Sequence, residues 1–263
     1  MERISQHLMG VKHLILGAQC KLEKITFPIK KVSVVPENKW LEMVDGCLVH
    51  KETGALIFVP VGTTSLPQGI KSIQAHALVN FTHDRLVIPS SAKQISLNNL
   101  TGGFTNLKEL VFEEGVEDIS IEDITFLPDV KITFPSTLKR VNMCNVSAGT
   151  IEIPLACELD RFRSSRINNL IFAGDVELRP SPLYQESGGV TTEIYYNTFD
   201  DFSGNITFRG QVSLRVALEV GGEEECYFGK MKDGGTITVA DLATCDVIRS
   251  AKDYNSNVAI TVE

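Results

Sequence analysis

The apolar positions of this chain follow a short alternating pattern that recurs. Apolar–x–apolar triplets begin at residues 86, 110, 132, 151 and 170, at spacings of 24, 22, 19 and 19 residues, and proline directly follows three of them. Alternation with a period of two is typical of a strand that buries one face. Proline ends such a strand because it has no N–H to give to a ladder. The pattern therefore predicts one short strand in each repeat.

A second apolar pair follows each of the early triplets. It starts six residues after the triplet and has the spacing apolar–x–x–apolar, at residues 70–73, 92–95, 116–119 and 138–141. This phrase is too short for a helix, so we expect a tight turn or a bent strand. Further triplets begin at residues 25, 56, 206, 237 and 260, with a degenerate one at 64, and residues 241–251 predict one short helix.

A single repeat of about 20 residues buries too little apolar surface to fold alone, so the repeats must stack and share a core. A period of 19 to 24 residues matches that of leucine-rich repeats, although the asparagine of their usual motif is missing. The sequence therefore predicts a mainly β fold. The expected architecture is a leucine-rich-repeat solenoid with stacked coils of about 19–24 residues, a parallel strand ladder and few or short helices.

The repeat resembles the BspA-like, bacterial surface-protein type of leucine-rich repeat. Residues 107–112, followed by Val116 and Ile119, fit that family's coil line. Residues 42–60 are similar to its inserted hairpin, with Thr53 and Gly54 as the turn. The Ala-Phe and Cys that usually end a coil of the family leave only a partial trace at 73–78, which marks a diverged member. The resemblance implies adhesion or protein binding and carries no catalytic residues.

The pattern also predicts how the chain is organised. Residues 1–62 hold irregular N-terminal coils with an inserted β-hairpin at about 43–60, and residues 63–180 hold the regular coils. Residues 181–204 read as a loop or insertion, and 205–263 continue the solenoid within one continuous domain. An exposed C-terminal strand can pair edge to edge, so a homodimer through it is an open alternative.

Composition narrows the set of partners. The 263 residues carry 25 Lys and Arg against 33 Asp and Glu, a net charge of −8, which argues against nucleic acid. No apolar segment has the length of a signal peptide or membrane span, so we expect a cytoplasmic protein without membrane contact. An upstream native start would make it extracellular. The six cysteines lack metal-ligand spacing, which indicates reduced core thiols and neither metal nor cofactor.

Two groups of residues are candidates for contact with a protein partner. The outward positions of the triplets form a β-branched and scarcely charged row, which either reflects strand propensity or is a binding face. A basic cluster follows the acidic residues 113–123, which we interpret as solvated surface. The arginines of this cluster either contact a partner or form ion pairs between neighbouring coils. The candidates are Val87, Val111, Thr133, Glu152 and Ile171 in the row, and Arg161, Arg163 and Arg166 in the cluster.

No catalytic motif accompanies this repeat. The five histidines are scattered, and the Gly-x-Ser-x-Gly and phosphate-binding glycine motifs are absent. We therefore expect a non-catalytic protein-binding scaffold that uses the exposed face of the solenoid, such as a small intracellular inhibitor or effector encoded by a virus or mobile element, of bacterial or phage origin. The alternative is a surface adhesin or glycan-binding module. A more distant one is a polysaccharide-cleaving enzyme, for which Asp160 with Arg161 is the starting point.

Overall fold

The computed structural model of the protein describes residues 11–22, 25, 29–74, 76–98, 104–154, 156–159, 161–178, 181–187, 190–196, 198–199, 201–214, 228, 231–232, 234–251 and 257–263. It confirms the predicted fold class: the chain is mainly β and forms a parallel β-solenoid of about nine stacked turns. The chain divides into two compact units. Unit 1 comprises Met1–Ile119 and Ile124–Thr137, and unit 2 comprises Ser120–Asp123 and Leu138–Glu263.

Unit 1 begins with irregular coils. Strands β1 (His13–Leu16) and β2 (Lys31–Val34) are parallel, whereas β3 (Leu41–Val44), β4 (Cys47–His50) and β5 (Ala55–Phe58) form an antiparallel meander. Asp45 and Gly46, with φ of 49° and 80°, turn the chain between β3 and β4. The hairpin expected at about 43–60 lies in this meander, with Thr53 and Gly54 between β4 and β5.

The regular coils of unit 1 carry one strand for each triplet. Strands β7 (Arg85–Ile88), β9 (Glu109–Phe112) and β11 (Lys131–Thr133) are parallel and in register. The inward residues of β7 and β9 are buried, and the rings of Phe112 and Phe134 stack with centroids 5.9 Å apart. Parallel pairing follows because each coil returns to its starting edge before the next strand begins.

The second apolar pair of the regular coils also opens a strand, so of the two expected alternatives the strand is confirmed and the tight turn is wrong. In unit 1, β6 (Ser72–Ile73) and β8 (Gln94–Asn98) begin there, and β10 (Asp118–Glu122) lies where the two units divide. The reason is visible in β8, where Ile95 and Leu97 are both buried. Alternate burial continues past the pair and keeps the backbone extended.

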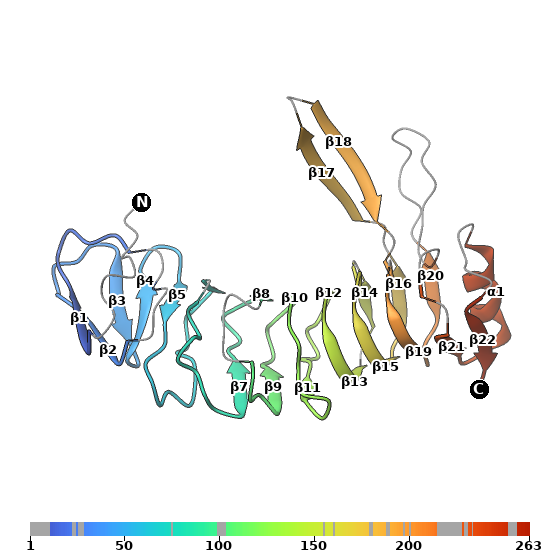
Figure 1. Ribbon diagram of the computed structural model, residues 1–263, viewed down its shortest axis with the longest axis horizontal. Helices are drawn as coiled ribbons and strands as arrows, with labels where there is room; N and C mark the ends of the chain where they lie inside the picture. The colour runs from blue at the N-terminus through green and yellow to red at the C-terminus, as the bar shows by residue number, and fades with distance from the viewer. Residues whose placement is uncertain are drawn as a thin grey trace. The chain divides into compact units, whose positions relative to one another are not determined.

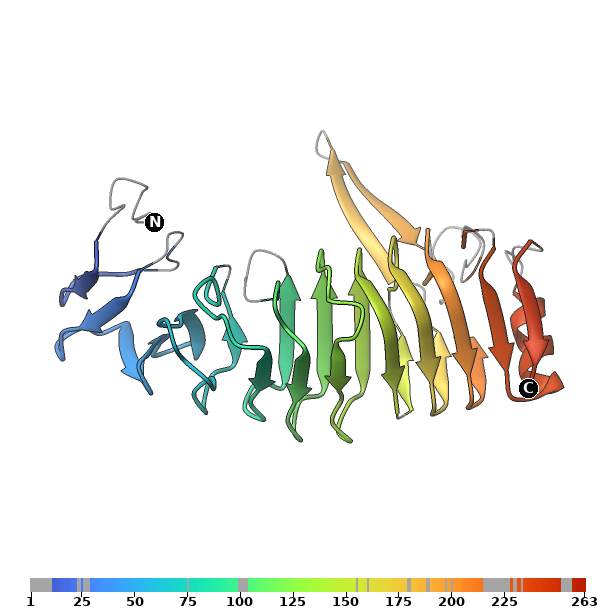
Figure 2. The same ribbon diagram turned by 60° about the horizontal axis from the view of Figure 1, so that its bottom comes forward.

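Unit 2 contains two parallel ladders (Figures 1 and 2). The first is formed in this order by β12 (Arg140–Cys144), β14 (Cys157–Leu159), β16 (Val176–Leu178) and β20 (Val212–Leu214). The second, formed by the triplets, runs β13 (Ser147–Ile153), β15 (Arg166–Phe172), β19 (Ser203–Phe208), β21 (Thr236–Val239) and β22 (Ala259–Val262).

Six phenylalanines form the aromatic core of unit 2. Phe172 stacks on Phe208 with ring centroids 5.3 Å apart, and Phe199 stacks on Phe228 at 5.5 Å. Phe199 and Phe202 are fully buried, so they anchor the segment that follows the insertion. The side chains of Tyr195 and Tyr196 lie outside the described part of the structure. The six phenylalanines are Phe162, Phe172, Phe199, Phe202, Phe208 and Phe228.

The corners of unit 2 that connect its ladders are fixed by polar side chains. Asn145 and Ser164 have φ of 52° and 55°, in the left-handed region that asparagine tolerates best among residues with a Cβ. The Asn145 side-chain amide donates to Asp123 Oδ1 at 2.8 Å. Buried Ser165 accepts from the Val146 N–H and donates to the Met143 carbonyl, so one hydroxyl joins two successive coils.

The insertion at residues 181–204 is more ordered than the expected loop. Strands β17 (Ser181–Ser187) and β18 (Val190–Tyr196) form an antiparallel two-stranded sheet of their own. Gly188 and Gly189 stand between these strands in the sequence, where glycine is a common turn residue. The pairing of β15 with β19 continues on either side of the insertion, from Leu170 with Ile206 to Phe172 with Phe208.

The expected short helix is confirmed as α1 (Leu242–Ser250). Asp241 is its N-cap, and the side chain accepts from the Thr244 N–H at 2.7 Å. The helix packs beside β20 and β22 and buries Thr244, Cys245 and Ile248. Within the part of the chain that the structure describes, no helix is long and apolar enough to cross a membrane.

Candidate functional site

The predicted outward row is divided between the two sheets that the triplets form. We call these sheets the outer sheets; they consist of β7, β9 and β11 in unit 1 and of β13, β15, β19, β21 and β22 in unit 2. In unit 1, Val87, Val111 and Thr133 are register partners on β7, β9 and β11; the two valines are half-buried and Thr133 is exposed. A charged row runs beside it, in which Arg85 Nε donates to Glu109 Oε2 at 2.7 Å. This part of the row therefore combines two half-buried valines and a threonine with a neighbouring ion pair.

In unit 2, Glu152 and Ile171 are register partners, and the row continues through three threonines. Thr207 follows Ile171 on β19, Thr238 lies on β21, and Thr261 lies on β22. Glu152 Oε1 accepts from Arg209 Nη1 at 3.2 Å, and the hydroxyls of Thr238 and Thr261 are 3.2 Å apart. Register pairing thus aligns one charged, one apolar and three hydroxyl side chains.

A second row beside it forms a chain of hydrogen bonds. Asn169 donates to Thr150 Oγ1 at 3.3 Å, Asn205 donates to Asn169 Oδ1 at 3.4 Å, and Thr236 donates to Asn205 Oδ1 at 3.0 Å. We call these four residues, Thr150, Asn169, Asn205 and Thr236, the amide–hydroxyl row. The sequence holds the clue, since each precedes the first apolar residue of a triplet, but only register shows that they meet.

The three arginines of the basic cluster lie at different depths. Arg166 is exposed at the start of β15, whereas Arg161 and Arg163 are half-buried and accept main-chain hydrogen bonds from Met143 and Asn145. Arg161 Nε is buried and has no hydrogen-bond acceptor among the residues that the structure describes. Contact between this cluster and a partner therefore stays a prediction.

Cys144 lies close to two of these arginines. Burial raises the pKa of the Cys144 thiol, and the carboxylate of Glu122 adds to that rise. The guanidinium groups of Arg161 and Arg163 act in the opposite direction, but burial is the largest of these effects. The thiol is therefore held in its neutral form and is a poor nucleophile.

The other described cysteines are also free thiols. Burial raises the pKa of Cys47 to about 11 and that of Cys157 to about 12, with smaller contributions from the nearby carboxylates of Asp45 and Glu158. Such thiols behave as small apolar groups of the core, as the sequence indicated for Cys157. Cys226 lies outside the described residues.

The acidic residues 113–123 are used between coils. Glu113 accepts from the Ser90 N–H at 3.0 Å, Glu114 accepts from the Ser136 N–H at 2.9 Å, and the Lys93 ammonium lies 3.7 Å from Glu117. The two hydrogen bonds to Glu114 from Ser136 lower the pKa of its carboxyl group. In the described part of the chain, no group of three metal-ligating side chains converges.

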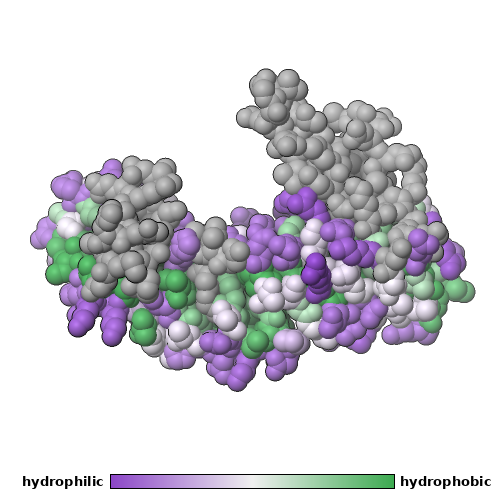
Figure 3. Space-filling model, viewed as in Figure 1, coloured by the Kyte–Doolittle hydropathy of each residue, from purple (hydrophilic) through white to green (hydrophobic). Residues whose placement is uncertain are grey.

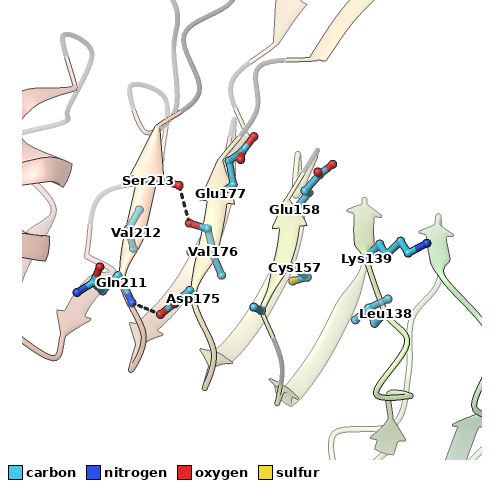
Figure 4. Close-up of a pocket in the computed structure, with 11 residues that line it drawn as sticks. Leu138, Lys139, Cys157, Glu158, Asp175, Val176, Glu177, Gln211, Val212 and Ser213 are labelled. Carbon is cyan, nitrogen blue, oxygen red and sulfur yellow. Dashed lines mark hydrogen bonds between the residues drawn. The ribbon is translucent and has the colours of Figure 1, made fainter.

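A groove with a volume of about 510 Å³ crosses the first ladder of unit 2 (Figure 4). Its wall begins at Leu138 and Lys139, and it extends past β14 and β16 to β20. Leu138, Cys157, Val176 and Val212 are nearly buried and form an apolar base. The charged groups that line it are Lys139, Glu158, Asp175 and Glu177.

Comparisons with known proteins give little to set beside this geometry. No family model matches the chain, and no curated protein matches it. One solved structure that matches is titled "The Crystal structure of Pneumococcal vaccine antigen PcpA", with a TM-score of 0.46 and 16% sequence identity. The match covers 96% of this chain and 56% of that one, so this chain spans little more than half of that antigen's length.

Proposed function

We propose that the protein is a non-catalytic scaffold that binds a protein partner through the outer sheet of unit 2. The observation that carries this proposal is the alignment of five strands, β13, β15, β19, β21 and β22, whose outward side chains are exposed or half-buried. Solenoid proteins commonly bind along such an extended surface. Its backbone is fixed by the ladder, so little conformational entropy is lost when a partner binds.

The chemistry of this sheet also favours burial under a partner. Covering a polar group is costly when its hydrogen bonds are lost, and cheaper when a neighbour already satisfies it. The amide–hydroxyl row meets that condition through its own hydrogen bonds, and Glu152 is paired with Arg209. On the molecular face drawn in Figure 3, green apolar areas are small and lie between purple and white ones. A mixed surface of this kind is typical of non-obligate protein interfaces.

The test places a charge in the middle of the proposed surface. Wild-type protein and an Ile171→Arg/Thr207→Arg variant are used to capture partners from the native host, and each saturable partner is titrated by calorimetry. We expect the variant to bind at least about tenfold more weakly, a loss of about 1.4 kcal/mol. Thr133→Arg, at the equivalent position in unit 1, is the control and should bind normally. Equal affinities for all three proteins would refute the location of the surface.

The arginine cluster gives a second arm of the same experiment. Arg161→Glu/Arg163→Glu/Arg166→Glu reverses three charges and should weaken the partner if the cluster contributes complementary charge. Unchanged affinity would limit the surface to the outer sheet. We propose as well that the protein is a diverged BspA-like leucine-rich repeat and a small intracellular inhibitor or effector encoded by a virus or mobile element.

Glycan binding is the second candidate, and the amide–hydroxyl row favours it. Asn169, Asn205 and Thr236 present amide and hydroxyl groups, which are the partners that sugar hydroxyls use. A glycan array read with wild type and an Asn169→Ala/Asn205→Ala variant separates the two candidates. A glycan that binds wild type and not the variant would support glycan binding. If no glycan on the array binds wild type, the protein-binding function remains.

A further inference from the structure

Arg161 is an exception among the polar side chains of unit 2. Of the buried side-chain nitrogens and oxygens in the described part of the chain, its Nε is the one without a hydrogen-bond partner. The side chain also forms no ion pair with a described residue, although Arg161 as a whole is half-buried. A guanidinium that is partly removed from water without a counter-charge costs free energy in the folded protein. A ligand that brings a negative charge would remove this cost.

Main-chain hydrogen bonds on both sides hold the segment that carries Arg161. The Met143 N–H donates to the Arg161 carbonyl at 2.7 Å, and the Phe162 N–H donates to the Thr198 carbonyl at 2.6 Å. The Phe162 ring is fully buried and contacts two other phenylalanine rings, which anchors the residue directly after Arg161. The backbone below the guanidinium is thus fixed before a ligand arrives, so little conformational entropy is lost on binding.

The neighbouring coils surround Arg161 with neutral groups. Asn142 and Thr198 flank the main-chain hydrogen bonds of this segment, and both are buried and uncharged. The side-chain amide of Asn142 donates to Ser120 Oγ at 3.3 Å, and its Oδ1 accepts from the Cys144 thiol at 3.5 Å. The polar groups of Asn142 are therefore used between and within coils, and they leave the charge of Arg161 uncompensated.

The thiol of Cys144 shows which charged groups lie around this position. Burial raises the pKa of the thiol, Glu122 adds to the rise, and Arg161 and Arg163 oppose it, so these three charged groups lie near one thiol. The Glu122 carboxylate accepts from Ser120 Oγ at 3.0 Å and forms no ion pair with Arg161. Because Glu122 weakens the positive potential here, a singly charged carboxylate suits Arg161 better than a phosphate with nearly two charges.

We propose that Arg161 binds the carboxylate of an Asp or Glu side chain from the protein partner through its terminal Nη groups, and so gains its counter-charge only in the complex. A planar guanidinium can form two parallel hydrogen bonds with a carboxylate, which fixes the orientation of the bound group. The inference rests on the proposed binding function and adds the chemical group that the partner brings to the arginine cluster. The net charge of −8 repels acidic ligands from the protein as a whole, so their binding requires a local positive site.

The first test follows the Nε–Hε resonance of Arg161 by NMR in isotope-labelled wild-type protein. The probe is a capped seven-residue peptide of alternating glutamate and serine, and the control peptide has glutamine in place of glutamate. We expect a saturable shift with the glutamate peptide and none with the glutamine peptide. Arg161→Lys, which keeps the charge but lacks Nε, identifies the resonance. A resonance that the glutamate peptide leaves unmoved would overturn the proposal.

The second test compares two neutralised arginines by fluorescence anisotropy, with the glutamate peptide carrying fluorescein. Arg161→Met should bind the peptide at least tenfold more weakly than wild type does. Arg85→Met in unit 1 removes the same charge from an existing ion pair and should bind as wild type does. Equal weakening in both variants would mean general electrostatic attraction and would overturn the proposal.

Thermal unfolding of Arg161→Met distinguishes a binding role from a structural one. This variant should unfold at the same temperature as wild type or at a higher one, because it removes an unpaired and partly buried charge. A lower unfolding temperature would show that Arg161 stabilises the free protein and would contradict the proposal.

The outcome can be separated from that for the outer sheet. In the Ile171→Arg/Thr207→Arg variant, the Arg161 resonance should respond to the glutamate peptide as it does in wild type. If it does, and this variant captures the native partner normally, the outer sheet fails as the binding surface while the carboxylate site stands. If the resonance stays unmoved and the variant loses the partner, the carboxylate site fails while the outer sheet stands.

Discussion

The outer sheets of the two units share a design on the inside and differ on the outside. In unit 1, the row beside the outward stripe is charged and contains the ion pair between Arg85 and Glu109. In unit 2, the equivalent row is the neutral amide–hydroxyl row, in which hydroxyl and amide groups bond to one another. Both rows hold adjacent strands together, one by charge and one by neutral hydrogen bonds.

This difference separates what the repeat requires from what it permits. Inward positions of the triplets are apolar and buried on β7 and β9 in unit 1 and on β13, β15, β19 and β21 in unit 2, since they form the shared core of the stacked coils. Outward positions need only fit an extended strand, so they can differ between units without changing the fold. Differences between the units at outward positions are therefore where binding properties are to be sought.

The strongest test of the shared interior removes one stacked ring from each unit. Phe112→Ala in unit 1 and Phe172→Ala in unit 2 should each lower the free energy of unfolding by about 3–5 kcal/mol, because both rings are buried and stacked. Urea unfolding followed by circular dichroism measures the loss, and Trp40 fluorescence reports on unit 1. Phenylalanine-to-leucine variants are the milder controls. A loss below about 1 kcal/mol in either unit would show that its interior is not close-packed.

A smaller effect is expected where coils approach each other closely. Gly204 in unit 2 has φ of 135°, and a Cβ there would overlap the Ile167 carbonyl. Gly62 in unit 1 also has positive φ, of 87°, but a Cβ there would meet open space. Gly204→Ala should therefore cost about 3 kcal/mol or more, and Gly62→Ala about 1 kcal/mol. Thermal unfolding measures both, and equal losses would contradict the close approach.

The hydroxyl groups that join successive coils should contribute less to the free energy of unfolding than the close approach at Gly204. Ser165 is fully buried in unit 2, and its loss leaves the Val146 N–H without an acceptor, so Ser165→Ala should cost about 1–3 kcal/mol. Thr137 in unit 1 accepts from the Gly115 N–H and donates to the Val116 carbonyl but is only half-buried. Thr137→Val should cost less because water can replace the hydroxyl. The reverse order in urea unfolding would break this comparison.

Salt should distinguish the two outer rows. Arg85→Met should cost under about 1 kcal/mol at low salt and nearly nothing in 1 M NaCl, where charges are screened within about 3 Å. Asn205→Ala should cost about 0.5–1 kcal/mol at either concentration, because its partners are neutral. Urea unfolding at 0.05 M and 1 M NaCl, for each variant against wild type, gives both values. If the stability loss of Asn205→Ala also depended on salt, the distinction between a charged row in unit 1 and a neutral row in unit 2 would be wrong.

The smallest expected effect is the loss of the α1 N-cap at low pH. Hydrogen bonds from Thr244 lower the pKa of the Asp241 carboxyl group, so this N-cap stabilises α1 above the unfolded pKa of about 4. That contribution is lost as the pH falls through the lower, folded-state value. The protection of the Thr244 amide against hydrogen exchange, relative to its intrinsic rate at each pH, should therefore fall as the pH is lowered below about 4. Asp241→Asn, which caps without titrating, should not show this step, and identical pH profiles would contradict the assignment.

Much of this fold could be predicted from the sequence because its core repeats. Alternating residues such as Leu86 and Ile88 gave the strands, and their spacing gave the stacking. The second strand of each coil was predicted only as one of two alternatives, because the apolar–x–x–apolar phrase is also typical of a turn. Alternation in Val141 and Met143, both buried on β12, was the overlooked clue. The β17–β18 hairpin was missed although Gly188 and Gly189 stand between its two strands in the sequence.

The candidate sites were less predictable because they depend on register. The change of spacing from 22 to 19 residues is visible in the sequence, but only pairing shows that Glu158 and Glu177 become neighbours. The same holds for Asn169 and Asn205, which are 36 residues apart along the chain. Residues that a pattern assigns to separate coils meet only when the length of every corner between them is known.

The β17–β18 hairpin shows where the chain can be lengthened. Its two strands occupy a corner between β16 and β19, yet Leu170 and Ile206 remain paired across it. Loop length adds only slowly to the entropy cost of closing a corner, so a longer or different sequence there has little thermodynamic penalty. That corner is thus a natural position for grafting an epitope tag or a biosensor domain.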